Sequence, residues 1–297
     1  MSDRIIAVTG ATGNIGSRVA RQLAAKGSRQ ILVVRDPSRA PKLDNAEIRQ
    51  ASGYINGNQM RAAFEGSHTV FLISGSESAI RVAEHITAVN AAVAAGVERI
   101  VYLSYFDAAE DSIFTFARDH HATEQHIRTT GIPFTFLRMN MFMDFVPSMV
   151  SVDGVISGPA SDGRAAAVAR DDIADAAVAV LTSDAHEGTI YDLTGREAFS
   201  LADAAALMSR VSGKRITFHN ETVEEAYASR VVYNAPDWEV AGCVTTYTAI
   251  AAGQLERVSD DVRRLTGHEP LTLAEYLEAH PGSLDHVVNG ERATRPI

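Results

Sequence analysis

The segment 4–35 constrains the fold of this chain more than any other. It opens with a mostly apolar stretch, 4–9, typical of a buried strand, and continues at once into the glycine-rich turn Gly10-Ala11-Thr12-Gly13-Asn14-Ile15-Gly16. A helix is predicted over 17–26 and a second strand over 30–34. This order predicts a dinucleotide-binding βαβ unit, and a purely structural glycine-rich turn is the alternative.

The spacing of the three glycines suits a pyrophosphate. Gly10 permits the tight turn, Gly13 lets the backbone approach the phosphates, and Gly16 lets the helix pack on the strand. The helix N-terminus adds free N–H groups and the positive end of a dipole. We therefore expect the cofactor to bind at the turn and at the ends of neighbouring strands, namely at Gly10, Thr12, Gly13, Asn14, Ile15, Arg35, Ser74 and Gly75.

The end of the second strand indicates which nucleotide is preferred. An NAD-binding unit usually has Asp or Glu there, whereas this strand ends at Val34 and is followed by Arg35. A guanidinium binds a 2′-phosphate through charge-assisted hydrogen bonds, so the sequence predicts NADP(H). Two alternatives remain: Arg35 is a surface cation paired with Asp36, or Asp36 binds the ribose of NAD.

Composition excludes several classes of protein. A net charge of −10 disfavours nucleic acid and membrane surfaces as partners. The one cysteine, Cys243, leaves no intrachain disulfide, and the histidines do not have metal-ligand spacing, so no metal is expected. No secretory signal and no apolar run of about 18 residues occurs. We expect a soluble cytoplasmic protein.

Strand and helix patterns alternate through the first half of the chain. Further strands are predicted over 46–50, 69–73, 99–104 and 134–138, separated by helices over 58–64, 79–95 and 114–130. Such alternation predicts an α/β fold with a doubly wound parallel Rossmann sheet and a smaller, mostly helical C-terminal lobe. We expect an NADP(H)-binding domain over 1–150, to which 165–195 return, a substrate-side lobe over 196–280, and a mobile tail over 281–297.

Six segments carry a resemblance to a known family: TGATGNIG (9–16), VRDPS (34–38), AGVERIVYLS (95–104), HHATE (120–124), GIPFTFLR (131–138) and LTGHEPLTL (265–273). With them the chain resembles the NmrA-like group of atypical short-chain dehydrogenases/reductases. Within that group it is similar to the NADPH-dependent quinone oxidoreductases and triphenylmethane reductases.

The resemblance raises a question about catalysis. Most short-chain dehydrogenases use a Ser, a Tyr and a Lys for proton transfer. Ser104 matches the Ser position, but Phe116 stands at the Tyr position and His120 at the Lys position. The resemblance implies that His120 contacts the nicotinamide ribose or relays a proton, the alternative being a histidine packed beneath the cofactor. Tyr105 is the alternative proton donor, unless it only lines the pocket. The candidate catalytic residues are therefore Ser104, Tyr105 and His120.

The stretch after the sixth strand is expected to contact the acceptor. The resemblance implies that 139–145 line this site, with Met139, Asn140 and Phe142 as candidate substrate contacts. Flexible methionines and flat phenylalanines suit an aromatic ligand, although a plain hydrophobic core is the alternative. Trp238 and Tyr233 are further candidates from the lobe.

Three functions remain open. The first is an NADPH-dependent oxidoreductase that transfers hydride to a quinone or a related conjugated aromatic acceptor. The second is a non-catalytic NADP(H) sensor that binds a protein partner, which the missing tyrosine favours. The third is a reductase or isomerase of secondary metabolism. The acceptor is not identified by the sequence, and a homodimer is left open.

Overall fold

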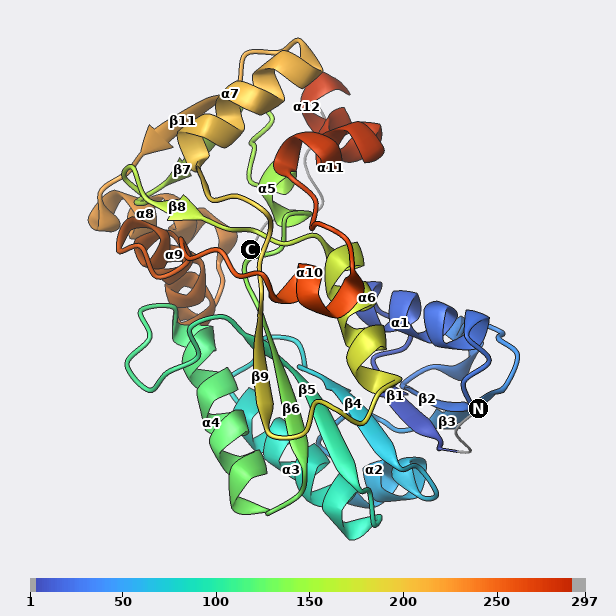
Figure 1. The fold of residues 1–297 in the computed structure, drawn as a ribbon. Helices are drawn as coiled ribbons and strands as arrows, with labels where there is room; N and C mark the ends of the chain where they lie inside the picture. The colour runs from blue at the N-terminus through green and yellow to red at the C-terminus, as the bar shows by residue number, and fades with distance from the viewer. Residues whose placement is uncertain (1–3, 290–297) are drawn as a thin grey trace.

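The central feature of the computed structural model, which describes residues 4–289, is a seven-stranded sheet (Figure 1). All its strand pairs are parallel, and the strand order is β3-β2-β1-β4-β5-β6-β9. The strands are β1 (Ile6–Thr9), β2 (Gln30–Val34), β3 (Ala46–Gln50), β4 (Thr69–Ile73), β5 (Arg99–Tyr105), β6 (Phe134–Met139) and β9 (Thr189–Leu193). The chain leaves β1 toward β2 on one side and β4 lies on the other, so a topological switch point lies between β1 and β4.

Helices cover both faces of this sheet. α1 (Asn14–Ala25) packs beside α6 (Arg170–Leu181) on one face, and α3 (Arg81–Ala94) lies between α2 (Gly57–Phe64) and α4 (Thr115–Thr129) on the other (Figure 1). Central strands such as β2 and β5 are buried along their whole length for this reason. Alternate residues serve different cores: Val101 and Leu103 pack with the α1 face, whereas Ile100 and Tyr102 pack with the α3 face.

The C-terminal lobe is built from two separate stretches of chain. Residues 151–165 supply β7 (Val155–Gly158), which pairs in parallel with β11 (Thr217–Asn220), and β8 (Arg164–Ala165), which pairs with β10 (Phe199–Ser200). The remaining helical elements of the chain are α5 (Phe145–Ser148), α7 (Leu201–Ser212), α8 (Val223–Arg230), α9 (Asp237–Ala251), α10 (Asp261–Thr266), α11 (Leu273–Ala279) and α12 (Asp285–Asn289), with the short 3-10 turns η2 (Val231–Tyr233) and η3 (Pro281–Leu284). A further 3-10 turn, η1 (Pro37–Arg39), follows β2 and lies outside the lobe.

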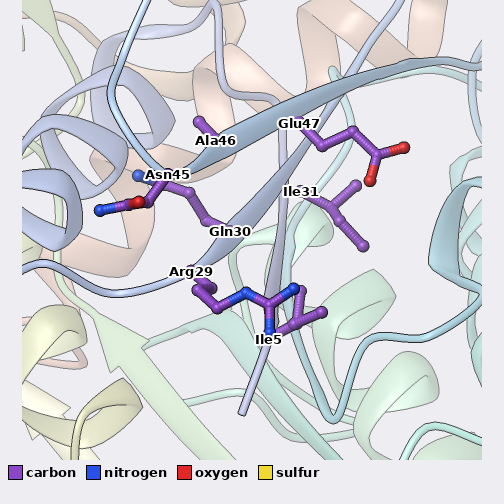
Figure 2. A pocket seen from close by; sticks show the side chains of 7 residues that line it. All are labelled: Ile5, Arg29, Gln30, Ile31, Asn45, Ala46 and Glu47. Carbon is purple, nitrogen blue, oxygen red and sulfur yellow. The ribbon is translucent and has the colours of Figure 1, made fainter. Parts of the chain in front are cut away.

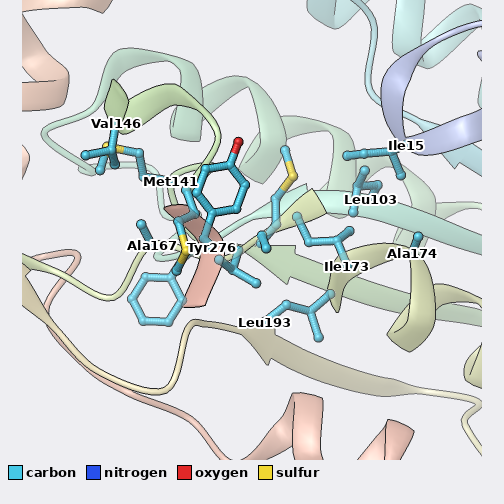
Figure 3. Close-up of a cluster of buried hydrophobic side chains, with 14 of the residues drawn as sticks. Ile15, Leu103, Met141, Val146, Ala167, Ile173, Ala174, Leu193 and Tyr276 are labelled. Atoms are coloured by element: carbon cyan, nitrogen blue, oxygen red, sulfur yellow. The ribbon is translucent and has the colours of Figure 1, made fainter. Parts of the chain in front are cut away.

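One hydrophobic core joins the lobe to the sheet. Tyr276 and Val146 lie in the same buried cluster as Leu103 of β5 and Leu193 of β9 (Figure 3). Because this core is continuous, the lobe is held over the carboxyl ends of the strands.

The predicted fold class is confirmed, and two details differ from the expectation. The two small sheets of the lobe were not predicted. Residues 281–289, expected within a mobile tail, form η3 and α12, because Leu284 and Val287 are buried in the core. The rest of that predicted tail, 290–297, lies outside the described residues. Within 4–289, no helix is both long enough and apolar enough to span a membrane.

The contact between α1 and β1 gives a first prediction. A Cβ at Gly16 would lie 2.3 Å from the carbonyl oxygen of Gly10, so Gly16→Ala must push the start of α1 away. We expect a loss of about 1–3 kcal/mol in the free energy of unfolding, as for other overpacked sites, together with weaker NADPH binding.

The matched control is Gly66→Ala. Gly66 has a φ of +78° and nothing within 4 Å of the added Cβ. This variant is expected to lose about 1–2 kcal/mol through backbone strain but to keep its affinity for NADPH. Thermal unfolding and calorimetric titration measure both quantities, and equal NADPH affinities of the two variants would contradict the account.

Candidate active site

A cleft of about 930 Å³ lies at the carboxyl ends of β1, β2, β4, β5 and β6 and is closed by α9 of the lobe. Its position at the switch point is where α/β proteins of this topology bind ligands. The cleft is lined by all nine residues proposed as cofactor contacts: Gly10, Thr12, Gly13, Asn14, Ile15, Arg35, Ser74, Gly75 and His120.

The turn between β1 and α1 forms a backbone cradle in this cleft. Gly10 has a φ of +60°, and its carbonyl accepts a hydrogen bond of 2.8 Å from the Gly13 amide. No side chain caps α1, and no acidic residue lies in its first turn. The helix N-terminus is therefore open to an anion, and the residues present fit a dinucleotide pyrophosphate.

The end of β2 offers one suitable cation. Arg35 is exposed and lines the cleft, and it forms no ion pair with any residue within 4–289. Asp36 instead caps η1, accepting hydrogen bonds from the hydroxyl and the amide of Ser38, which lower the pKa of its carboxyl. Both bonds reach Oδ1, and Asp36 is not among the residues that line the cleft, which argues against it as the group that binds the ribose of NAD.

Ser104 does not reach the cleft. It is fully buried, and its hydroxyl donates a 2.7 Å hydrogen bond to Glu124, which pairs with Arg138. Ser104 lies two residues after Tyr102 on β5, so its side chain lies on the same face of the sheet as Tyr102, the face that α3 and α4 cover. The structure therefore does not support the predicted role of Ser104 in catalysis, and its contacts are those of a structural residue.

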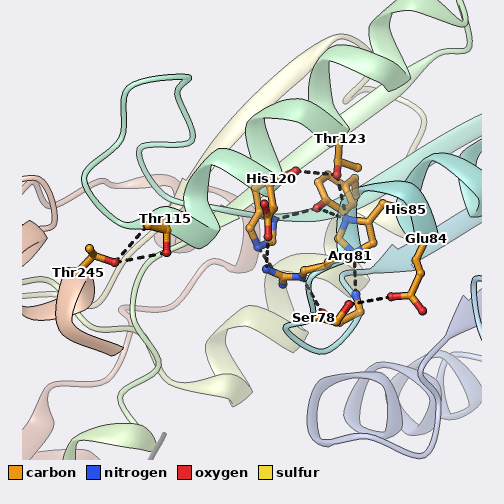
Figure 4. A network of polar contacts seen from close by, with 11 residues as sticks. Ser78, Arg81, Glu84, His85, Thr115, His120, Thr123 and Thr245 are labelled. Atoms are coloured by element: carbon orange, nitrogen blue, oxygen red, sulfur yellow. Dashed lines mark hydrogen bonds and ion pairs between the residues drawn. The ribbon is translucent and has the colours of Figure 1, made fainter. Parts of the chain in front are cut away.

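A buried polar network includes Arg81 and His120, which both line the cleft (Figure 4). Arg81 donates to His120 Nε2 at 3.3 Å, and His120 Nδ1 lies 2.9 Å from the Tyr102 hydroxyl. Because a guanidinium only donates, His120 must carry its proton on Nδ1. The amide of Gly75 likewise donates to His85 Nε2 at 2.8 Å, which places the proton of His85 on Nδ1.

Both histidines of the network are uncharged. Burial, followed by the positive charge of Arg81, lowers the pKa of His85 to about 3. The same two causes, in the same order, lower the pKa of His120 well below its usual range. His120 thus lines the cleft as a neutral imidazole, with Nε2 already accepting from Arg81.

Four aromatic rings form a wall of the cleft. Ring centroids lie 4.8 Å apart between Tyr105 and Phe114, 5.5 Å between Phe114 and Phe116, and 6.0 Å between Phe116 and Trp238. All four rings line the cleft. Burial raises the pKa of Tyr105, which therefore keeps its proton, and its predicted role as a proton donor stays a prediction.

The predicted substrate segment is only partly exposed to the cleft. Met139 and Phe142 line it, whereas Asn140 is buried and does not. The amide of Asn140 donates to the carbonyl of Leu255 at 3.0 Å and accepts from the backbone of Met141. Its predicted contact with substrate is therefore not supported. Tyr233 is 66% exposed and also lies outside the cleft wall.

Arg81 is a residue of the cleft that was not predicted from the sequence. It is the first residue of α3, it is only 3% exposed, and it lines the cleft. A cation at the positive end of a helix dipole is unfavourable, so an arginine beginning an alanine-rich helix was the available signal.

A second hollow, of about 320 Å³, lies at the opposite end of the sheet (Figure 2). It is lined by Ile5, Arg29, Gln30, Ile31, Asn45, Ala46 and Glu47. None of the sequence-predicted site residues lies there.

The fold and the cleft define a dinucleotide-binding α/β protein, and comparison with known proteins agrees. A family model described as NAD(P)H-binding matches residues 10–184. Quinone oxidoreductase 2 of Escherichia coli is 32% identical over 292 residues, covering 96% of this chain and 99% of that protein. An NAD(P)H azoreductase of Xenophilus azovorans is 28% identical and covers 93% of this chain and 98% of that protein.

Solved structures give the same result. The Escherichia coli quinone oxidoreductase QOR2 with NADPH has a TM-score of 0.85 at 32% identity, over 92% of this chain and 99% of that one. Triphenylmethane reductase of a Citrobacter species has a TM-score of 0.80 at 31% identity, over 96% and 99%. NmrA, a negative transcriptional regulator, covers 96% and 98% at 19% identity with a TM-score of 0.75, and shares the fold. This chain belongs to the NAD(P)H-binding, NmrA-like family, as its motifs predicted.

The position of Ser104 gives a second prediction. Ser104→Ala removes one of the hydrogen bonds to Glu124, whereas Arg138 still pairs with that carboxylate. We expect the free energy of unfolding to fall by about 1 kcal/mol and kcat to stay within about twofold of the wild type. Denaturant unfolding and steady-state kinetics measure these two quantities. A fall in kcat of about tenfold or more in a variant that keeps its fold would show that Ser104 takes part in catalysis.

Proposed function

We propose that this protein is an NADPH-dependent oxidoreductase that transfers hydride to a quinone or a related conjugated aromatic acceptor. One observation carries the proposal: a phosphate-binding backbone cradle and a wall of four aromatic rings lie in one continuous cleft. The names of the relatives, which include quinone, azo and triphenylmethane reductases, support the same class of acceptor.

The cofactor preference rests on Arg35. Its guanidinium lies where a 2′-phosphate is expected, at the end of β2, and Asp36 is engaged in capping η1. When bound, the reduced cofactor supplies a hydride to the acceptor. The cradle from Gly10 to Ile15 would hold the phosphates, and we expect the neutral His120 to contact the nicotinamide ribose.

The acceptor is positioned rather than activated by a protein acid. Phe116 stands where related dehydrogenases have a tyrosine, and its ring forms part of the aromatic wall. A planar acceptor is expected to stack on this wall, while Met139 and Met141 adapt to its outline. Hydride addition to a quinone gives a stabilised phenolate, which takes its proton from water.

The direct test is oxidation of NADPH with benzoquinone in the absence of flavin. We expect turnover well above the enzyme-free rate and a preference for NADPH over NADH. Tight NADPH binding without turnover of several quinones would contradict the proposal and favour the non-catalytic sensor. In the same assay, a lower rate for Tyr105→Phe at unchanged NADPH affinity would assign proton donation to Tyr105.

Arg35 gives a third prediction. Arg35→Ala removes charge-assisted hydrogen bonds to the 2′-phosphate, so we expect the KM for NADPH to rise about 10- to 100-fold, with little change for NADH. The matched control is Arg39→Ala, which removes an exposed cation of η1 that does not line the cleft. Equal effects of the two substitutions on the KM for NADPH would contradict the assignment.

A further inference from the structure

Arg81 is held at the base of the cleft by contacts that fix its position. Its Nε donates to the carbonyl of Gly75 at 2.9 Å, and its Nη2 donates to His120 at 3.3 Å. The guanidinium carbon lies 5.9 Å from the centre of the Phe116 ring, in the aromatic wall. The cation is therefore rigid and adjacent to the surface on which a planar acceptor is expected to stack.

One nitrogen of this guanidinium makes no hydrogen bond within residues 4–289. Nη1 of Arg81 is buried and has no hydrogen-bond partner within residues 4–289. The Asp119 carboxylate lies 3.8 Å away, which is an ion-pair distance but too long for a hydrogen bond. A buried donor without an acceptor is costly, and Arg81 lines the cleft. Because Nη1 itself has no exposed surface, a ligand oxygen satisfies this donor only if the side chains around Nη1 move when the ligand binds.

The charges around Arg81 leave this cation only partly compensated. His85 and His120 are neutral, and Asp119 is the one carboxylate that forms an ion pair with Arg81 among the described residues. Burial raises the pKa of Asp119, although Arg81 opposes this rise. The cleft thus contains a permanent positive charge at Arg81. The carboxylates of Glu77, Glu84 and Glu239 also line the cleft, but none of them forms an ion pair with Arg81 among the described residues.

We propose that Arg81 donates from Nη1 to the oxygen of the hydride acceptor and stabilises the negative charge that develops there. The inference rests on the proposed function and adds a specificity: acceptors whose oxygen becomes anionic on reduction. One proton and two electrons pass together as hydride from NADPH to the quinone, which gives NADP⁺ and a hydroquinone monoanion. The monoanion then takes one proton from water and leaves as the hydroquinone.

The same Nη1 group has a second candidate partner, an oxygen of the cofactor itself. Arg81 contacts His120, which is expected near the nicotinamide ribose, so a ribose hydroxyl is the competing acceptor. The two partners differ in one measurable respect: a contact with the cofactor changes NADPH affinity, whereas a contact with the acceptor does not.

The test compares Arg81→Gln and Arg81→Lys with the wild type. For Arg81→Gln we expect kcat with benzoquinone to fall about 100-fold, as for the loss of one preorganised donor, while the Kd for NADPH stays within about twofold. Arg81→Lys keeps the charge and is expected to recover part of the rate. Arg99→Gln is the control. Arg99 is also buried, at 5% exposure, but it is the first residue of β5 and lies at the end of that strand away from the cleft.

A binding measurement tests the same group without turnover. The probe is para-nitrophenolate, titrated calorimetrically into the enzyme with NADP⁺ at a pH where the phenol is ionised, with nitrobenzene as the uncharged comparison. We expect Arg81→Gln to lose about tenfold or more in affinity for the phenolate and to bind nitrobenzene like the wild type.

The outcomes separate the two proposals. If the wild type turns over no quinone, the proposed function fails, and the para-nitrophenolate titration still decides whether Arg81 binds an anionic oxygen. If Arg81→Gln keeps both its rate and its phenolate affinity, the inference about Arg81 is wrong. A rise in the Kd for NADPH that matches the fall in kcat would overturn it as well, in favour of the ribose contact.

Discussion

Every part of the cleft depends on how closely α1 approaches the end of β1. The helix begins so near the strand that Gly16 has no room for a side chain beside the carbonyl of Gly10. This approach leaves the uncapped N-terminus of α1 facing the cleft, beside the switch point of the sheet. The parallel strands then bring the ends of β2, β4 and β5 to the same edge, where Arg35, Ser74 and Tyr105 line one cleft.

The second constraint is electrostatic and concerns the charge states of Arg81, His85 and His120. Arg81 is a permanent buried cation, and its hydrogen bond to His120 fixes that histidine as a neutral Nδ1–H tautomer. The backbone of Gly75 fixes His85 in the same way. With Phe116 in place of a tyrosine, the cleft presents charge and shape to an acceptor but no strong acid. Such a site suits acceptors that need little help with protonation.

The sequence predicted what is local and could not predict what depends on side-chain direction. The glycine-rich turn, Arg35 and the alternation of strands and helices follow from short motifs, and the structure places the residues proposed to bind the cofactor along one cleft. Ser104 could not be placed correctly, because its role depends on which face of β5 meets Glu124. Asn140 is turned away by a contact with Leu255, more than a hundred residues further along the chain.

The lobe was predicted least well for the same reason. β7 pairs with β11 across about sixty residues of sequence, and neither strand is long enough to produce a clear alternating pattern. The sequence around Arg81 only weakly indicated a role for this residue, because its contacts form only when α3, α4 and β5 pack together.

The charge and tautomer of His85 and His120 can be measured directly by nitrogen NMR of histidine-labelled protein with bound NADP⁺, with the two residues assigned by substitution. The account predicts that both rings remain neutral Nδ1–H tautomers from about pH 5.5 to pH 8, with no titration in that range. Titration of either ring near pH 6.5, or a signal from the Nε2–H tautomer of His120, would contradict it, because Arg81 would then not be hydrogen-bonded to a neutral imidazole.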